Sequence, residues 1–157
     1  MRRAEREVTD PKVLLQMIEA CRVCRLGLAD QQGIYIVPMN FGYEYEEGKL
    51  TLYFHSAKEG RKISAIAASP QVGFEMDGNH QLITAPSACG HSYGYESIIG
   101  NGTAQIVEDI AEKKKALKLL MQHQTGEVFS ITDQMANQVA VLKVEVYAFT
   151  GKRHQVG

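Results

Sequence analysis

The sequence predicts an α+β protein in which an antiparallel sheet curls into a small barrel and helices pack on its outside. Three observations lead to this fold class. Segments with the two-residue periodicity of strands follow one another along most of the chain. Turns separate most of them, and turns are the connection that antiparallel neighbours use. Only three segments are helical, whereas a doubly wound parallel sheet would need helices between most strands.

Length and charge restrict the class of protein further. The chain has 157 residues, which fits a single domain spanning residues 1–157. Its formal net charge of −1 gives no electrostatic reason to expect nucleic acid or a membrane surface as a partner. The start of the chain lacks the apolar core of a signal peptide, and the three cysteines are an odd number. We therefore expect a cytoplasmic protein.

The N-terminal half begins with a helix and continues with strands. Asp10 can cap this helix, and Pro11 suits its first position. Its apolar stripe consists of Val13, Leu14, Met17, Ile18 and Cys21. Strands are predicted at 24–30, at 34–46 as one long strand, and at 50–56. A short helix over 60–69 follows, and Pro70 ends it.

The C-terminal half continues the same pattern. The pair Gly78-Asn79 predicts a tight hairpin between strands at 71–77 and 80–85, and 86–94 resembles a loop. The next strand, 95–108, contains Gly100 and Gly102, which predict a bulge or a bend where the sheet curls.

The last two elements are a long helix and a strand. Asp109 can cap the helix, with Glu112 in the capping-box position and Gly126 beyond its end. The final strand covers 139–149. Its expected buried face consists of Ala140, Leu142, Val144, Val146 and Ala148.

Two adjacent cations stand in the first turn of the short helix. Arg61 and Lys62 lie where the helix dipole is already positive, which disfavours them by a few tenths of a kcal/mol. Both could be solvated surface residues. Alternatively, they surround a bound anion such as a phosphate, with backbone N–H groups, a close approach at Gly60 and the hydroxyl of Ser56. The pattern alone leaves both interpretations open.

The cysteines could be packed core residues, or they could be redox-active or bind zinc. Cys21 and Cys24 form a CxxC motif at the end of a helix, whereas redox pairs usually lie at a helix N-terminus. Packing in the core is the favoured interpretation. A zinc site that adds Cys89 and His91 would reach four ligands, but no second CxxC supports it, and no metal is expected.

One segment resembles a known family. The stretch FHSAKEGRKISAIAASPQVGFEM is similar to the flavin-phosphate segment of the pyridoxamine 5′-phosphate oxidase family, with SP where that family has NP. Further segments resemble its branch of nitroimidazole-resistance (Nim-like) proteins: REVTDP, CRVCRLGLAD, YIVPMNFGYE, YESIIGNGTAQIVED, LMQHQTG and VEVYAFTGK. The similarity covers most of the chain. It implies a split β-barrel homodimer that binds FMN at the subunit interface.

The resemblance also implies which residues hold the flavin. Ser56, Arg61 and Lys62 would bind its phosphate. The ring would lie along the second strand, against Val37, Pro38, Met39 and Asn40. A proline suits this position because it has no N–H and is tolerated on an edge strand.

Three further residues are expected near the cofactor. Tyr95 and Ser97 would contact the flavin of the partner subunit. His55 ends a strand beside Ser56, and it could act catalytically by exchanging a proton near neutral pH. Its alternative role is a structural one.

The implied function is an FMN-dependent oxidoreductase that reduces a small acceptor such as a nitroimidazole. Oxidation of pyridoxamine phosphate is one alternative, disfavoured because the chain ends at TGKRHQVG without the longer Arg/His-containing segment of those oxidases. A non-catalytic flavin or haem binding module is another. Deazaflavin also remains open, and so do the electron donor and the physiological acceptor.

Overall fold

The computed structural model describes residues 3–154. The strands are β1 (Glu7–Val8), β2 (Val23–Asp30), β3 (Gly33–Asn40), β4 (Gly42–Glu46), β5 (Lys49–Ser56), β6 (Gln71–Ile83), β7 (Ser92–Ile106) and β8 (Ala140–His154). The helices are α1 (Pro11–Ala20), α2 (Arg61–Ala68), α3 (Ile110–Thr125) and α4 (Asp133–Asn137), with 3₁₀ turns η1 (Ala4–Arg6) and η2 (Ala88–Gly90). No helix of the described chain is long and apolar enough to cross a membrane.

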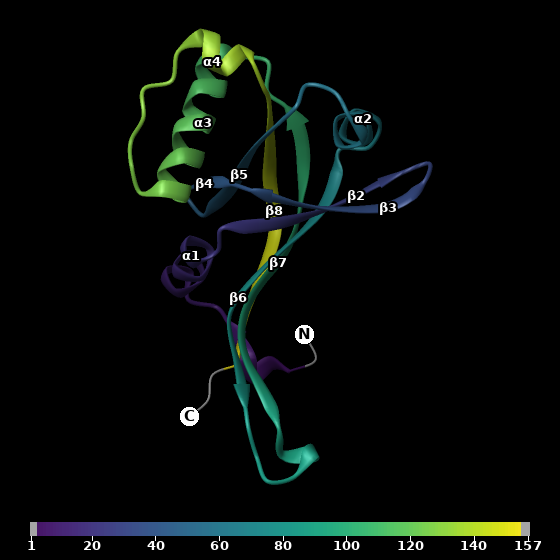
Figure 1. Cartoon of the computed structure of the whole chain (residues 1–157), viewed down its shortest axis with the longest axis vertical. Helices are drawn as coiled ribbons and strands as arrows, with labels where there is room; N and C mark the ends of the chain where they lie inside the picture. The colour runs from purple at the N-terminus through teal and green to yellow at the C-terminus, as the bar shows by residue number, and fades with distance from the viewer. Residues whose placement is uncertain (1–2, 155–157) are drawn as a thin grey trace.

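The strands form one antiparallel sheet that curls without closing. Their order is β3-β2-β6-β7-β8-β5-β4, and β1 adds to β8. β3 and β4 lie at opposite ends of this order, yet they are consecutive in the chain and only Phe41 separates them. The sheet therefore bends back until its two ends meet at one residue, which confirms the predicted α+β split barrel (Figure 1).

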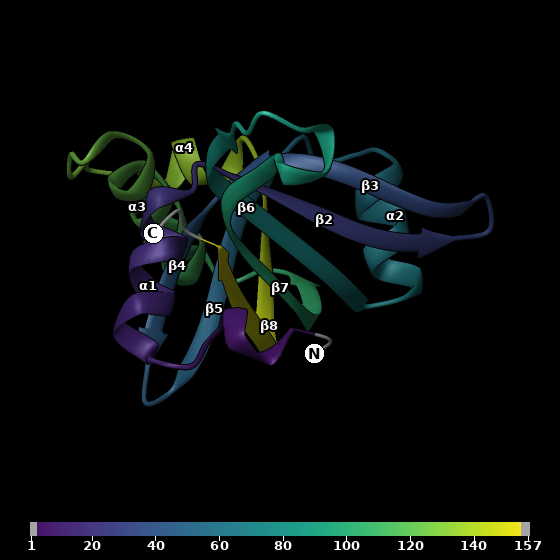
Figure 2. The ribbon, with the colours of Figure 1, turned by 90° about the horizontal axis from the view of Figure 1, so that it is seen from below.

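The helices lie at different sides of the curled sheet. α2 lies beside the β2–β3 hairpin, whereas α3 lies on the opposite side against β4 and β5, with α4 packed on α3 (Figures 1 and 2). The outer parts of β6 and β7 extend away from the barrel as an arm (Figure 1). The core fills the barrel with side chains from α1, α2 and most strands, including Met17, Leu26, Phe54, Phe74 and Leu142.

Two predictions about strands are wrong. The segment 34–46 is two strands, because the chain leaves β2 at Asn40 and pairs with β5 from Gly42. Gly78-Asn79 does not form a hairpin. β6 runs through this pair, and the register with β7 shifts between Gly78 and Gln81, so that the irregularity is a bulge rather than a turn.

The end of β8 also differs from its prediction. Gly102 pairs with Val146 and Asn101 with Ala148, so that Tyr147 is an extra residue at this bulge. The alternation of faces therefore reverses, and Ala148 is exposed while Phe149 packs against the core. The bulge itself was predicted from the two glycines of β7, and it is confirmed.

The helix boundaries agree with their capping residues. Asp10 accepts from the backbone N–H of Lys12, and Asp109 accepts from that of Glu112. Gly126 adopts the left-handed conformation at the end of α3. The predicted loop at 86–94 contains η2, and β7 begins within it at Ser92.

Candidate functional site

The N-terminus of α2 differs from the other α-helix starts of the described chain. Side chains cap α1, α3 and α4, but α2 has no side-chain cap. Its N-cap residue, Gly60, has φ of 131°, a conformation that favours glycine, and a Cβ there would meet nothing within 4 Å. The Ile63 N–H donates to the Gly60 carbonyl, whereas the N–H groups of Arg61 and Lys62 have no partner within residues 3–154. Free N–H groups at a helix start are the donors that anions use.

Arg61 has a partner inside the chain. Its Nε and Nη2 donate to the two carboxylate oxygens of Asp30 at 2.7 and 2.9 Å, and its guanidinium lies 4.5 Å from the centre of the Tyr35 ring. The hydrogen bond from Arg61 lowers the pKa of Asp30, and the same bond raises the pKa of Arg61. The unfavourable cation at the helix start is therefore neutralised by the acid that ends β2.

Lys62 remains as the second cation. It is half-buried and has no ion-pair partner within residues 3–154. Ser56 is buried at the end of β5, and its hydroxyl donates to the carbonyl of Ala57 at 2.7 Å. His55 precedes it and is exposed. An ammonium and free backbone N–H groups at a helix start are groups that bind phosphate, and a hydroxyl such as that of Ser56 is a further donor of the same kind.

β3 is an edge strand, as Pro38 predicts. It pairs with β2 on one side and ends the sheet on the other. Val37 and Met39 turn toward the core, while Pro38 and Asn40 are exposed on the outer face. A flat ligand could reach the backbone of this strand from its unpaired side, but the side chains of Val37 and Met39 are not available to it.

The side chain of Asn40 makes two hydrogen bonds, although Asn40 lies at an exposed strand position. Its Nδ2 donates to the carbonyl of Arg22 at 3.0 Å and to Oε1 of Gln124 at 3.1 Å. Gln124 belongs to α3, 84 positions further along the chain. Asp30 and Gln124 contact the predicted site only through the tertiary fold, so no local pattern in the sequence marks them.

Tyr95 and Ser97 do not meet α2 in one chain. They pair with His154 and Lys152 in the outer half of β7. The end of α2 approaches the same strand at Ala104, whose N–H donates to the carbonyl of Pro70. Seven residues of strand separate this point from Ser97, which corresponds to about 23 Å.

The environment of Tyr95 is cationic. Partial burial acts to raise the pKa of Tyr95, but hydrogen bonds from Arg6 and Lys152 outweigh it, so that this pKa lies below its ordinary value. The phenol would therefore carry some negative charge at a lower pH than a free tyrosine.

The cysteines show the features of packed core residues. Cys21 and Cys24 are buried and unpaired. Burial raises the pKa of Cys21 to about 11, and it raises that of Cys24 further. Cys89 is exposed on η2. Within residues 3–154, no group of three or more His, Cys, Asp or Glu side chains is placed to hold a metal ion.

Comparison with protein families gives one match along almost the whole chain. The model of the pyridoxamine 5′-phosphate oxidase family matches residues 10–153. No curated protein matches the chain.

Several solved structures share the fold. A protein from Bacteroides thetaiotaomicron, described as a candidate 5-nitroimidazole antibiotic resistance protein, is 35% identical with a TM-score of 0.81 and matches 94% of this chain and 86% of its own. The flavocytochrome Anf3 from Azotobacter vinelandii is 17% identical with a TM-score of 0.80, over 99% of this chain and 72% of its own. The FAD and heme binding protein from Mycobacterium smegmatis is 16% identical with a TM-score of 0.80, over 96% and 74%. At these two lower identities the likeness concerns the fold alone.

Proposed function

Because the chain belongs to the pyridoxamine 5′-phosphate oxidase family, we propose that it is an FMN-dependent oxidoreductase that reduces a small acceptor such as a nitroimidazole. The observation that carries this proposal is the start of α2. An uncapped helix N-terminus, an open glycine and a lysine without an acidic partner in the described chain form an anion site. Bound FMN would supply the redox chemistry, and the protein would bind and orient it.

The two cations would have different roles. Lys62 would meet the phosphate as a point charge, together with the free N–H groups of α2. Arg61 is held in place by Asp30 and keeps one nitrogen, Nη1, outside that pair, so that it could donate to the phosphate without leaving the carboxylate. Ser56 would need to turn its hydroxyl from the Ala57 carbonyl toward the ligand.

The flavin ring would lie along the free edge of β3. There the backbone from Val37 to Asn40 is accessible, and Pro38 removes one N–H that would otherwise be unpaired. His55, exposed beside Ser56, is the side chain we propose for exchanging a proton with the reacting molecule.

A second copy of the chain would complete the site. The outer sheet face carries exposed apolar side chains on β3, β7 and β8, namely Ile34, Ile36, Ile99 and Tyr147. The charged pair Arg25–Glu75 lies between the residues of β3 and Ile99 of β7, so this face combines apolar and charged groups, as many protein interfaces do. We propose that two copies pack through this face, so that Tyr95 and Ser97 of one copy approach the flavin held by α2 of the other.

Flavin binding tests the proposal directly. The purified protein, mixed with FMN and desalted, should keep about one FMN per subunit with the absorption bands of a bound flavin. Lys62→Ala should weaken FMN binding about 10- to 100-fold, because a charge-assisted hydrogen bond contributes roughly 1.5–3 kcal/mol.

The matched control is Lys118→Ala, which removes the same charge from an exposed position on α3. It should bind FMN like the wild type. Equal affinity in all three proteins, or no retained flavin in the wild type, would contradict the proposal. For the acceptor, the FMN-loaded protein reduced under anaerobic conditions should be reoxidised by a 5-nitroimidazole, and a flavin that stays reduced would remove this substrate class.

A further inference from the structure

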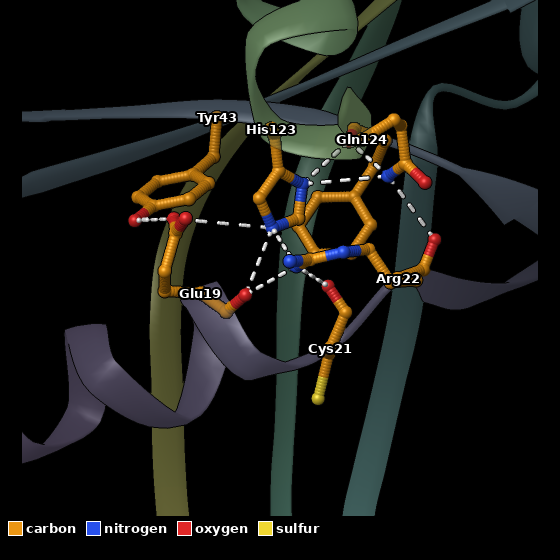
Figure 3. Close-up of polar contacts among 7 residues, drawn as sticks. Glu19, Cys21, Arg22, Tyr43, His123 and Gln124 are labelled. Carbon is orange, nitrogen blue, oxygen red and sulfur yellow. Dashed lines mark hydrogen bonds and ion pairs between the residues drawn. The ribbon is translucent and has the colours of Figure 1, made fainter. Parts of the chain in front are cut away.

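A hydrogen-bonded cluster that the proposed function does not use lies where β3 passes into β4. Figure 3 shows residues from the end of α1, the link between α1 and β2, the start of β4 and the end of α3 meeting there; Cys21 contributes its carbonyl, and its thiol points away. The labelled residues are Glu19, Cys21, Arg22, Tyr43, His123 and Gln124. Of these, His123, Gln124 and Tyr43 contact Phe41, the one residue between the two end strands of the sheet.

Two side chains at the end of α3 donate hydrogen bonds to the backbone carbonyl of Phe41. Nδ1 of His123 lies 2.8 Å from this oxygen, and Nε2 of Gln124 lies 2.9 Å from it. A carbonyl oxygen can only accept, so the hydrogen bonds at Phe41 are donated by these two nitrogens. His123 is 6% exposed, and α3 can come this close because the next residue, Gly42, has no side chain.

A second set of contacts holds the His123 ring from the other side. Nη1 of Arg22 lies 3.3 Å from Nε2 of His123, and the same nitrogen donates to the carbonyl of Glu19 at the end of α1. The ring of Tyr43 meets the His123 ring edge-on, with centroids 5.3 Å apart. The Tyr43 hydroxyl donates to the Glu19 carboxylate at 2.7 Å. These contacts connect α1, α3 and β4 around the His123 ring.

The cluster determines which way two side-chain amides point. Nε2 of Gln124 donates to the carbonyls of Phe41 and Arg22, at 2.9 and 3.2 Å, so its Oε1 must face away from both. That oxygen accepts from Nδ2 of Asn40, and the same Nδ2 donates to the Arg22 carbonyl. Both hydrogens of Asn40 Nδ2 are therefore used within the protein. Its Oδ1 has no donor within residues 3–154 and lies on the exposed side of β3.

We infer that Gln124 is a positioning residue that makes Asn40 a pure hydrogen-bond acceptor toward the flavin. The inference rests on the proposed function and deepens it. An oxidised isoalloxazine ring carries a single N–H, at N3, and its other polar edge atoms accept. An acceptor on the protein can therefore pair with the oxidised ring only at N3–H. Asn40 thus recognises the N3–H edge of the ring, and Gln124 acts through Asn40 without touching the cofactor.

FMN and 3-methyl-FMN separate this inference from the proposed function. The methyl group removes the N3–H and leaves the phosphate unchanged. Wild-type protein should bind FMN about 3- to 10-fold more tightly than 3-methyl-FMN, the range expected for one neutral hydrogen bond. Asn40→Ala should bind the two ligands within about twofold of each other.

Gln124→Leu tests the positioning role. It removes the donors to the carbonyls of Phe41 and Arg22 and the oxygen that accepts from Asn40. The preference for FMN over 3-methyl-FMN should therefore shrink as it does in Asn40→Ala. The control Gln122→Leu changes an exposed residue on the same helix and should keep the wild-type preference. Because the ratio of two affinities is measured, a uniform loss of stability does not produce this result. If Gln124→Leu does not fold, Gln124→Lys replaces it: the ammonium can donate to the two carbonyls but offers no acceptor to Asn40, so the preference should also shrink.

Two results would overturn the inference. Equal binding of FMN and 3-methyl-FMN by the wild type would show that N3–H is not recognised, while FMN retention would leave the proposed function intact. An unchanged preference in Asn40→Ala or in the folded Gln124 variant would show that N3–H recognition, if present, depends on other residues. Failure to bind either flavin would instead contradict the proposed function.

Discussion

Asp30 determines the charge of the candidate site. The two adjacent cations of α2 would repel each other and the helix dipole, but the Asp30–Arg61 pair leaves Lys62 as the cation without an ion-pair partner in the described residues. This carboxylate ends a strand 31 positions before Arg61, and no local pattern in the sequence joins the two. Its contribution to stability should depend on pH in a definite direction.

The hydrogen bond from Arg61 lowers the pKa of folded Asp30 below its ordinary value of 3.8. A depressed carboxyl pKa stabilises the folded protein above the unfolded-state pKa, and this contribution is lost as the pH falls through the folded pKa. We expect Asp30→Asn to lower the urea midpoint at pH 7 and to have a smaller effect below about pH 3, measured by circular dichroism. Asparagine can still accept from the Gln32 N–H through its one oxygen, but the substitution removes both the charge and one of the two acceptors for Arg61.

Asp133→Asn serves as the comparison. Asp133 pairs with Lys114 at an exposed position, where an ion pair contributes little. An Asp30→Asn midpoint that matches the wild type at pH 7, or a difference that persists unchanged at low pH, would contradict a stabilising role for the Asp30–Arg61 pair.

At the scale of elements, the close contact between α3 and β4 brings His123 and Gln124 to the Phe41 carbonyl. A Cβ on Gly42 would lie 2.5 Å from Cα of Leu120, so that backbone of α3 would have to move. We expect Gly42→Ala to lower the free energy of unfolding by about 1–3 kcal/mol, the usual cost of overpacking. Chemical denaturation measures this directly. A wild-type unfolding free energy would mean that α3 can shift from β4 at no cost.

The sequence predicts elements well where local chemistry defines them. Asp10 and Asp109 mark two helix starts, and Gly100 and Gly102 mark a bulge, because capping and bulges depend on neighbouring residues. The break at Phe41 was missed because the apolar alternation continues across it, and only the change of pairing partner from β2 to β5 reveals it.

The supposed hairpin at Gly78-Asn79 failed for a related reason. A turn dipeptide and a bulge share glycine and asparagine, since both need unusual backbone angles, and Asn79 indeed has φ of 54°. The candidate site shows the same division. Arg61, Lys62 and Ser56 could be recognised from one continuous segment, whereas Asp30 and Gln124 depend on contacts across the fold.

At the scale of the whole molecule, the predicted flavin residues fall into two groups. One group lies around α2 and β3, and the other lies on the outer half of β7, about 23 Å along the strand from the contact with α2. A single chain does not bring them together. If both groups bind one flavin, the second group must come from another copy, and we propose that the contact forms at the sheet face that carries the exposed apolar residues of β3, β7 and β8.

Mixed dimers test this shared site most directly. Lys62→Glu removes the phosphate cation, and Ser97→Trp blocks the proposed contact on β7. Each variant alone should keep almost no FMN after desalting, and Lys118→Glu should keep the wild-type amount. In a dimer of one Lys62→Glu chain and one Ser97→Trp chain, one site combines both defects and the other contains neither. We predict that the isolated mixed dimer retains about half of the wild-type FMN per dimer. A mixed dimer without FMN would contradict a flavin site shared between two subunits.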